Sequence, residues 1–220
     1  MAIGYNTSMD LGWNGGSGNL NVTYTVSSGA NRLLVVALST SNGNIDDMTG
    51  VTYNGVSLTQ AIKIQSTQGR WAYLYYLLNP ASGANSLVVS TTDQIAGTAA
   101  DYTGVAQAAQ PDATASGDSG AATGSFTQAI TVGTVNSWVM GTTCQNANTS
   151  PAAGAGETSR ITSAFLFVYQ FDSNADLSTG SHSFTTTNGS QTNMATLLVS
   201  FKPSVAAPVS PPGVYFDTIF

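Results

Sequence analysis

Short runs of alternating apolar and polar residues, separated by Gly, Asn and Ser, recur along most of this 220-residue chain. In an extended strand this alternation places one face against a core and the other face in water. Charged residues, among them the helix formers Glu, Lys and Arg, make up only 7% of the sequence, whereas Thr, Val, Tyr and Ser are abundant. The pattern therefore predicts an essentially all-β protein.

The alternating runs predict roughly ten to twelve strands, at a spacing typical of a two-sheet antiparallel β-sandwich of the jelly-roll or Ig-like kind. Asn54-Gly55 lies between two runs and predicts a tight hairpin, because the central residues of that turn need positive φ. Residues 32–40 and 71–78 are apolar on both faces, so each is expected to be a central strand covered on both sides. The other strands are expected at residues 20–26, 48–64, 86–92, 98–105, 126–132, 137–143, 164–171, 182–187 and 194–202.

The strands are expected to form a single domain over residues 1–203, since all-β domains often reach this length as one unit. Residues 106–125 are of low complexity and rich in small side chains, and they predict a long surface excursion within that domain. Pro203 ends the last strand, because proline has no N–H for the ladder. Residues 204–213 follow as a Pro-rich linker, and residues 214–220 as a C-terminal extended strand.

The charge and hydropathy of the chain argue against several classes of partner. A formal net charge of −6 with Lys and Arg totalling 5 leaves no basic patch for a run of phosphates, so nucleic acid is not expected. No stretch is long and apolar enough to span a membrane, and no secretory signal peptide is recognised at the N-terminus, so we expect synthesis in a cytoplasm. Cys144, the single cysteine, is expected to be a buried thiol.

Packing and turn signatures are found in the stretches GANRLLVVALSTS, TGVTYNGVSLTQA, YYLLNPASGANSLVVS, ADYTGV and ATLLVSFKP. Together these stretches, within residues 28–203, resemble a β-sandwich module found in phage virion proteins and bacterial surface proteins. The resemblance implies the fold and no catalytic element. The module in surface proteins normally follows an export signal or lies in a larger chain. Because neither is recognised here, we favour a virion protein assembled in the host cytoplasm.

Two short motifs suggest chemistry, and their context weakens both. Gly117-Asp118-Ser119-Gly120 matches the motif around the nucleophile of chymotrypsin-like proteases, but those enzymes need a histidine before the serine, and the single histidine, His182, follows it. His182 is therefore expected to be structural or exposed. The stretch from Asp172 to Asp176 has oxygen ligands at alternate positions, as a calcium loop does, yet it lacks the Gly and Glu that an EF-hand requires. We expect a solvated turn there.

The other acidic residues give little basis for an enzyme. Asp46-Asp47 is an equally weak oxygen cluster, and Glu157, the single Glu, is expected in a flexible loop. A glycosidase needs two opposed carboxylates that meet in space, which spacing along the chain does not reveal. We therefore expect no catalytic residues, no metal and no cofactor.

Aromatic side chains support an alternative function as a glycan-binding surface or adhesion module, because aromatic faces suit pyranose rings. Trp13 and Trp71 are the candidate platform residues. For residues 71–76, packing in a core is the simpler explanation, since both faces of that strand are apolar.

Residues 214–220, with the sequence VYFDTIF, have high β-propensity and a single charge, and left free they would be prone to aggregate. We expect this strand to dock on a neighbouring subunit or on a scaffold protein, and covering an edge of its own sandwich is the alternative. The residues expected to make this contact are Val214, Tyr215, Phe216, Ile219 and Phe220.

The expected function is that of a non-enzymatic structural protein on the virion exterior, namely a phage capsid decoration or cement protein. Its expected partners are further copies of itself, preferably as a trimer, and a capsid or tail scaffold protein. A tail or fibre component is the closest alternative, because it would use the same sandwich and the same exterior chemistry.

Overall fold

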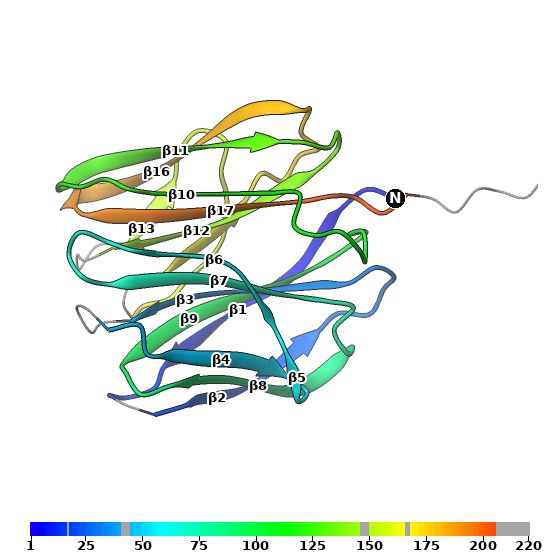
Figure 1. The fold of residues 1–220 in the computed structure, drawn as a ribbon, viewed down its shortest axis with the longest axis horizontal. Coiled ribbons are helices and arrows are strands. Elements are labelled where there is room, and N and C mark those ends of the chain that lie inside the picture. The colour runs from blue at the N-terminus through cyan, green and yellow to red at the C-terminus, as the bar shows by residue number, and fades with distance from the viewer. Residues whose placement is uncertain (17, 41–44, 146–149, 166–167, 206–220) are drawn as a thin grey trace, which may run out of the picture.

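The computed structural model describes residues 1–16, 18–40, 45–145, 150–165 and 168–205, and within them the chain is all-β. The seventeen strands of these residues form four antiparallel sheets, which lie on one another as four layers (Figure 1). The predicted all-β sandwich architecture is therefore confirmed, with four sheets in place of the expected two.

The first half of the chain forms two of the four sheets. The first outer sheet has the order β2-β8-β4-β5, from strands β2 (Leu20–Val26), β8 (Gly83–Thr91), β4 (Met48–Tyr53) and β5 (Val56–Ser57). The first inner sheet has the order β1-β9-β3-β7-β6, from strands β1 (Gly4–Trp13), β9 (Ile95–Thr103), β3 (Leu33–Thr40), β7 (Trp71–Leu78) and β6 (Thr59–Gln65).

The second half forms the other two sheets. The second inner sheet has the order β10-β17-β12-β15-β14, from strands β10 (Ala113–Asp118), β17 (Met194–Phe201), β12 (Trp138–Gln145), β15 (Tyr169–Asp172) and β14 (Thr158–Thr162). The second outer sheet has the order β11-β16-β13, from strands β11 (Thr123–Val132), β16 (Gly180–Thr192) and β13 (Pro151–Ala153).

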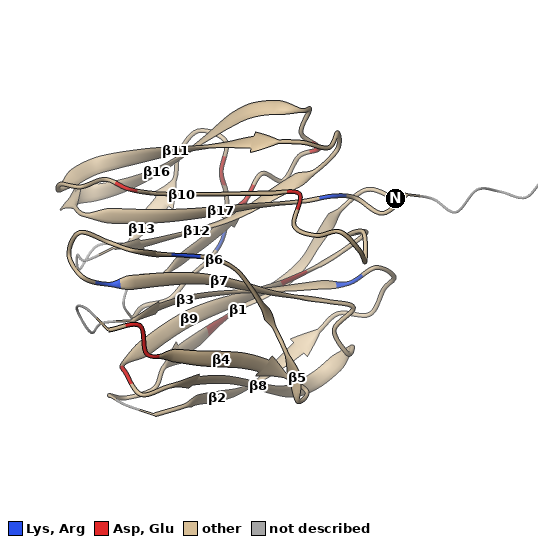
Figure 2. Ribbon diagram, in the orientation of Figure 1, with Lys and Arg blue, Asp and Glu red and all other residues tan. Residues whose placement is uncertain are grey.

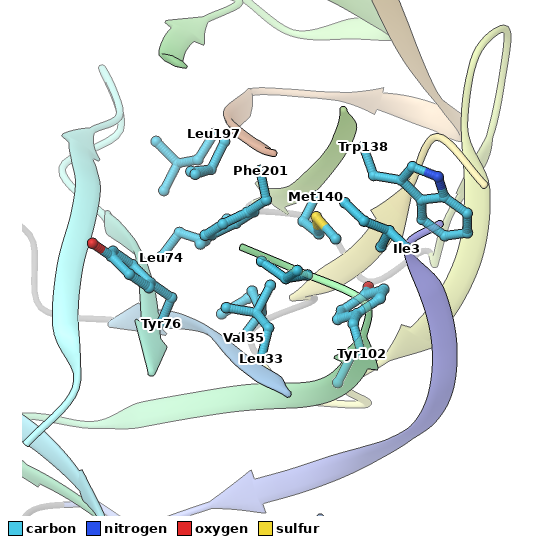
Figure 3. Close-up of a cluster of buried hydrophobic side chains, with 14 of the residues drawn as sticks. Ile3, Leu33, Val35, Leu74, Tyr76, Tyr102, Trp138, Met140, Leu197 and Phe201 are labelled. Atoms are coloured by element: carbon cyan, nitrogen blue, oxygen red, sulfur yellow. The ribbon is translucent and has the colours of Figure 1, made fainter. Parts of the chain in front are cut away.

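Each of the three interfaces between the layers holds an apolar core. The first core lies between the outer and inner sheets of the first half, and the second core lies between those of the second half. The central core lies between the two inner sheets and joins the halves (Figure 3). Its side chains include Leu33, Val35, Leu74, Tyr76, Tyr102, Trp138, Met140, Leu197 and Phe201.

The layered arrangement explains why some strands are apolar on both faces. Along β3, alternate residues point to opposite sides, so that Leu33 and Val35 enter the central core while Leu34 and Val36 enter the first core. All the residues of β3 are buried. The prediction that residues 32–40 and 71–78 form central strands covered on both sides is confirmed for β3 and for most of β7.

The two halves share one topology. The two inner sheets have the same strand order. The first sheet's β1, β9, β3, β7 and β6 correspond in turn to the second sheet's β10, β17, β12, β15 and β14. In the outer sheets, β11, β16 and β13 correspond in the same way to β2, β8 and β4. The chain is therefore an internal structural repeat, which the sequence analysis did not detect.

Left-handed residues recur at matching places in the two halves. Asn31 (φ 57°) and Asn136 (φ 61°) precede β3 and β12, and Asn79 (φ 48°) and Asn174 (φ 45°) follow β7 and β15. Asn tolerates this conformation better than most residues with a side chain. The paired asparagines, each at the end of an inner strand, are the sequence signal by which the repeat can be recognised.

The local predictions differ from the structure in several places. Residues 106–125, expected to be a surface excursion, contain β10 and the beginning of β11, so the low-complexity segment is part of the sheets. Residues 4–13 form β1 and residues 158–162 form β14, and no strand was expected at either place. The hairpin at Asn54-Gly55 is confirmed, with φ of 50° and 75°.

The N-terminus and the last described residues lie together at one end of the layers (Figure 1). The Met1 amino group donates a hydrogen bond to the Ser204 carbonyl at 2.6 Å, and the Ser204 N–H donates to the Gly104 carbonyl at 2.7 Å. Pro203 and Val105 form an isolated β-bridge beside them. The segment beyond Val205 therefore starts from a fixed point at this end.

Candidate functional site

The residues predicted to dock on a partner, Val214, Tyr215, Phe216, Ile219 and Phe220, lie outside the described residues. The structure does describe the surface from which this segment starts. That surface is an open groove of about 450 Å³ at the end of the molecule that holds the N-terminus. We call it the root groove, and its lining residues are Met1, Ala2, Thr134, Val135, Asn136, Asp176, Pro203, Ser204 and Val205.

The root groove exposes apolar side chains. Met1 is 63% exposed, Val135 is 56% exposed and Val205 is 92% exposed. Three large apolar side chains at one groove form an unusual surface on a protein whose outer strands carry mainly Thr, Ser and Asn. Val135 lies in the turn between β11 and β12, and nothing in the alternation of the sequence distinguishes it from an ordinary loop residue.

Trp13, one of the two candidate platform residues, lies on the surface at the end of β1. Its ring stacks on that of Phe165 with centroids 5.5 Å apart and an interplanar angle of 26°. Trp13 is 40% exposed and Phe165 is 45% exposed, and the two come from different halves of the chain. Sequence analysis missed Phe165, because it assigned the residue to a strand over residues 164–171, whereas β15 begins at Tyr169.

Trp71, the other candidate, is separate from this pair. It is only partly exposed at the start of β7, where it packs against the first core and stacks on Tyr73 with centroids 6.1 Å apart. The Lys63 ammonium lies 5.3 Å from the centroid of its ring. This environment leaves Trp71 a packing role and makes Trp13 the better candidate for contact with a ligand.

The protease-like motif is a joint between the two halves. The Asp118 carboxylate accepts hydrogen bonds from the N–H groups of Gly120 at 2.6 Å and Thr67 at 3.1 Å, and from the Asn193 amide at 3.2 Å. The Ser119 hydroxyl donates to the Ala121 carbonyl at 2.7 Å. These contacts give the Asp and the Ser of the motif structural partners.

The stretch that resembled a calcium loop is held by an ion pair. Asp172 is fully buried, and both its oxygens accept from the Arg160 guanidinium, at 2.6 and 2.8 Å. Arg160 also lies over the Tyr5 ring, 4.0 Å from its centroid, and so links the two inner sheets. The expectation of a solvated turn is therefore wrong for Asp172. Asp176 accepts from the Trp138 indole N–H at 2.9 Å.

The other titratable candidates also have structural partners. Asp46 forms an ion pair with Lys63 and accepts from the Tyr73 hydroxyl at 2.7 Å. Hydrogen bonds from these two groups outweigh the opposing effect of burial and lower the pKa of Asp46. His182 is partly exposed, and its Nε2 lies 2.8 Å from the Ser178 carbonyl oxygen. Cys144 is buried, as predicted, and burial raises its pKa to about 12.

Glu157 lies in a polar network at the second core. The Thr186 hydroxyl donates to Glu157 Oε1 at 2.8 Å, and Thr186 is joined to Thr143 at 2.7 Å, which is joined in turn to Thr196 at 2.9 Å. Burial raises the pKa of Glu157 to about 7, in spite of the hydrogen bond from Thr186. The carboxyl is thus anchored in a network, where the sequence analysis expected a flexible loop.

Charged residues are few, and none lies within the strands of the two outer sheets, which are tan throughout in Figure 2. Among the described residues, no three His, Cys, Asp or Glu side chains lie close enough together to hold a metal ion. No helix in the described ranges is long and apolar enough to cross a membrane. Two surfaces of the described residues expose large apolar or aromatic side chains in contact or around one groove, the root groove and the Trp13–Phe165 pair, and we consider these for function.

Comparisons with known proteins return no match for this chain among protein-family models, curated proteins or solved structures.

Proposed function

We propose that the protein is a non-enzymatic structural protein of the virion exterior, a phage capsid decoration or cement protein, held to neighbouring subunits through residues 214–220. A tail or fibre component would use the same means of attachment. The proposal combines the resemblance noted in the sequence with the placement of the root groove.

We infer that each half is a jelly roll. The orders β1-β9-β3-β7 and β2-β8-β4-β5 are those in which an eight-stranded jelly roll arranges its two sheets, and β6 is an added edge strand. The second half follows the same order with a shorter outer sheet. Jelly rolls are frequent in viral capsid proteins and also in lectins, so the fold supports the proposal without deciding it.

The observation that carries the proposal is the geometry of one end of the molecule. The N-terminus, the start of the C-terminal segment and the root groove with its exposed Met1, Val135 and Val205 all lie there. A subunit attached at this end would present the opposite end to the exterior. The exposed apolar surface would then be covered in the assembly.

The composition of the C-terminal segment favours contact between different copies. A Pro-rich stretch of the length of residues 206–213 extends about 25 Å as a polyproline helix and resists folding back. The root groove lies at the base of this stretch, next to Val205. If residues 206–213 take this extended form, residues 214–220 would reach the root groove of a neighbouring copy more readily than their own.

Light scattering on the full-length protein and on a form cut after Gly213 tests the proposal. We expect a defined oligomer for the full-length chain and a folded monomer for the truncated form. Two monomers would rule out self-assembly through residues 214–220.

A pair of substitutions tests the groove. Val135→Asp places a charge in the root groove and is expected to abolish assembly as truncation does. Val56→Asp is the matched control, because Val56 is similarly exposed, at 53%, on β5 of the first outer sheet. If Val135→Asp assembled as well as Val56→Asp, the groove would be the wrong docking surface.

The Trp13–Phe165 pair favours glycan binding as the second candidate function. Two exposed, stacked aromatic rings offer outer faces on which a pyranose ring can pack. A glycan array is the test, with Trp13→Ala and Phe165→Ala expected to lose the signal and Val56→Ala expected to keep it. A silent array for the intact protein would remove this candidate.

A further inference from the structure

We propose that a small cavity between the two inner sheets is a binding site for a single monatomic anion, a halide such as chloride, held by Arg70 and Ser66. The proposal is independent of the function proposed above. It rests on an unpaired guanidinium beside an enclosed space.

The cavity lies where the two halves meet. It has a volume of about 10 Å³, which is close to the space that one water molecule needs. Its lining combines the β6–β7 turn and β7 of the first half with β12 and β17 of the second half. The lining residues are Ser66, Arg70, Ala72, Cys144, Gln145, Asn193 and Ala195.

Arg70 has a charge that the described residues do not balance. Its guanidinium takes part in neither of the ion pairs found among these residues, and its Nη1 atom is buried without a hydrogen-bond partner. Burial lowers the pKa of Arg70, which shows that the surroundings disfavour its charge. Arg70 as a whole is only partly buried, but its Nη1 is buried without a partner, and a bound anion beside that atom would offset the cost of desolvating the charge there.

A second donor lines the cavity. Ser66 is 8% exposed, and its hydroxyl accepts from the backbone N–H of Arg70 at 3.2 Å, which leaves the hydroxyl hydrogen available to donate. The lining contains no carboxylate. The Asp118 carboxylate contacts the lining residue Asn193, and its other hydrogen bonds come from Thr67 and Gly120.

The size and polarity of the cavity select the ligand. A water molecule would satisfy Nη1 without offsetting the charge of Arg70, whereas a halide would do both. Sulfate and phosphate are too large for a cavity of about 10 Å³, and a metal cation would be repelled by Arg70. A halide here would contact both halves and stabilise their packing.

The first experiment is crystallography of the full chain in sodium bromide. We expect an anomalous peak in the cavity within contact distance of Arg70 Nη1 and Ser66 Oγ. A cavity that holds only water, with no anomalous peak, would overturn the proposal.

The second experiment measures thermal unfolding at constant pH and ionic strength while bromide replaces gluconate. Because the ligand binds only the folded state, the midpoint should rise with bromide, by roughly 2–6 °C at concentrations well above the dissociation constant. Arg70→Gln should abolish this rise. Lys202→Gln also removes one positive charge, but away from the cavity, and this variant should keep the rise in midpoint with bromide. If the two variants responded equally to bromide, the result would count against the site.

Discussion

The two halves of the molecule share a topology but differ in how their cores are built. The first core buries sixteen apolar side chains of the described residues, whereas the second core buries seven. In the second half, the polar chain of Thr196, Thr143, Thr186 and Glu157 takes up space that apolar side chains fill in the first. One arrangement of strands is therefore stabilised in two different ways.

Corresponding positions show the difference directly. Counting from Asn31 and Asn136, Val36 of β3 corresponds to Gly141 of β12. A Cβ atom at Gly141 would lie 2.3 Å from the Phe171 ring, so the ring fills the space that a side chain on β12 would need. At this position the second core is therefore filled by an aromatic ring from β15, where the first core has the side chain of Val36 on β3.

The comparison teaches that the second half depends on the first. With a smaller core of its own, the second half gains much of its apolar burial from the central core (Figure 3). We therefore expect the chain to unfold as one cooperative unit. The predictions below test this dependence, from the largest expected effect to the smallest.

Phe201→Ala should have the largest effect. Phe201 of β17 is fully buried in the central core, and its ring lies 5.4 Å from that of Tyr76 in the first half. Loss of the ring should lower the free energy of unfolding by about 4 kcal/mol, as for other large-to-small core substitutions. Urea denaturation measures the loss, with Val56→Ala, at an exposed position outside the root groove, as control. If the backbone amides of the second half stayed protected from hydrogen exchange in the Phe201→Ala variant, the second half would not depend on the first.

Arg160→Met should have the next largest effect. The substitution leaves the buried Asp172 carboxylate without its cation and removes the contact with Tyr5, at an expected cost of about 3 kcal/mol. In the first half Tyr76 occupies the position that corresponds to Asp172, so the ion pair is specific to the second half. The double variant Arg160→Met/Asp172→Asn should recover part of the loss. If it were less stable than the single variant, the charge would not be the cause.

Glu157→Gln should have the smallest effect, confined to a pH window. The pKa of Glu157 is raised from 4.5 to about 7 on folding, so the folded state holds its proton more tightly than the unfolded chain. The contribution is fully present below pH 4.5 and is lost as the pH rises to about 7, a change of about 2 to 3 kcal/mol at most.

Thermal unfolding of both proteins between pH 5 and pH 8 measures this contribution. The Gln variant keeps an oxygen for the Thr186 hydroxyl and should show a smaller fall in stability with rising pH than the unmodified protein. The two proteins should converge at the acid end. Parallel pH profiles would mean that Glu157 is not the group responsible.

Predictions based on the alternation of side chains were the most successful. The doubly apolar run at residues 32–40, the hairpin at Asn54-Gly55 and the buried Cys144 are confirmed. The small residues of segment 106–125 hid β10, because a strand of Ala, Ser and Gly shows no hydrophobic alternation. Of the candidate site residues, Trp13 was proposed from its type alone and lies on the surface, whereas Phe165, on which it stacks, was not proposed.

The sequence by itself determined the all-β class, the positions of most strands and the low-charge Thr, Ser and Asn surface, because each depends on neighbouring residues along the chain. Only the tertiary structure decided which faces meet, since strands remote in sequence form each core. The contact of Tyr5 with Arg160, the stacking of Trp13 on Phe165 and the root groove all join the two halves. Such contacts depend on the path of the whole chain, which local patterns do not encode.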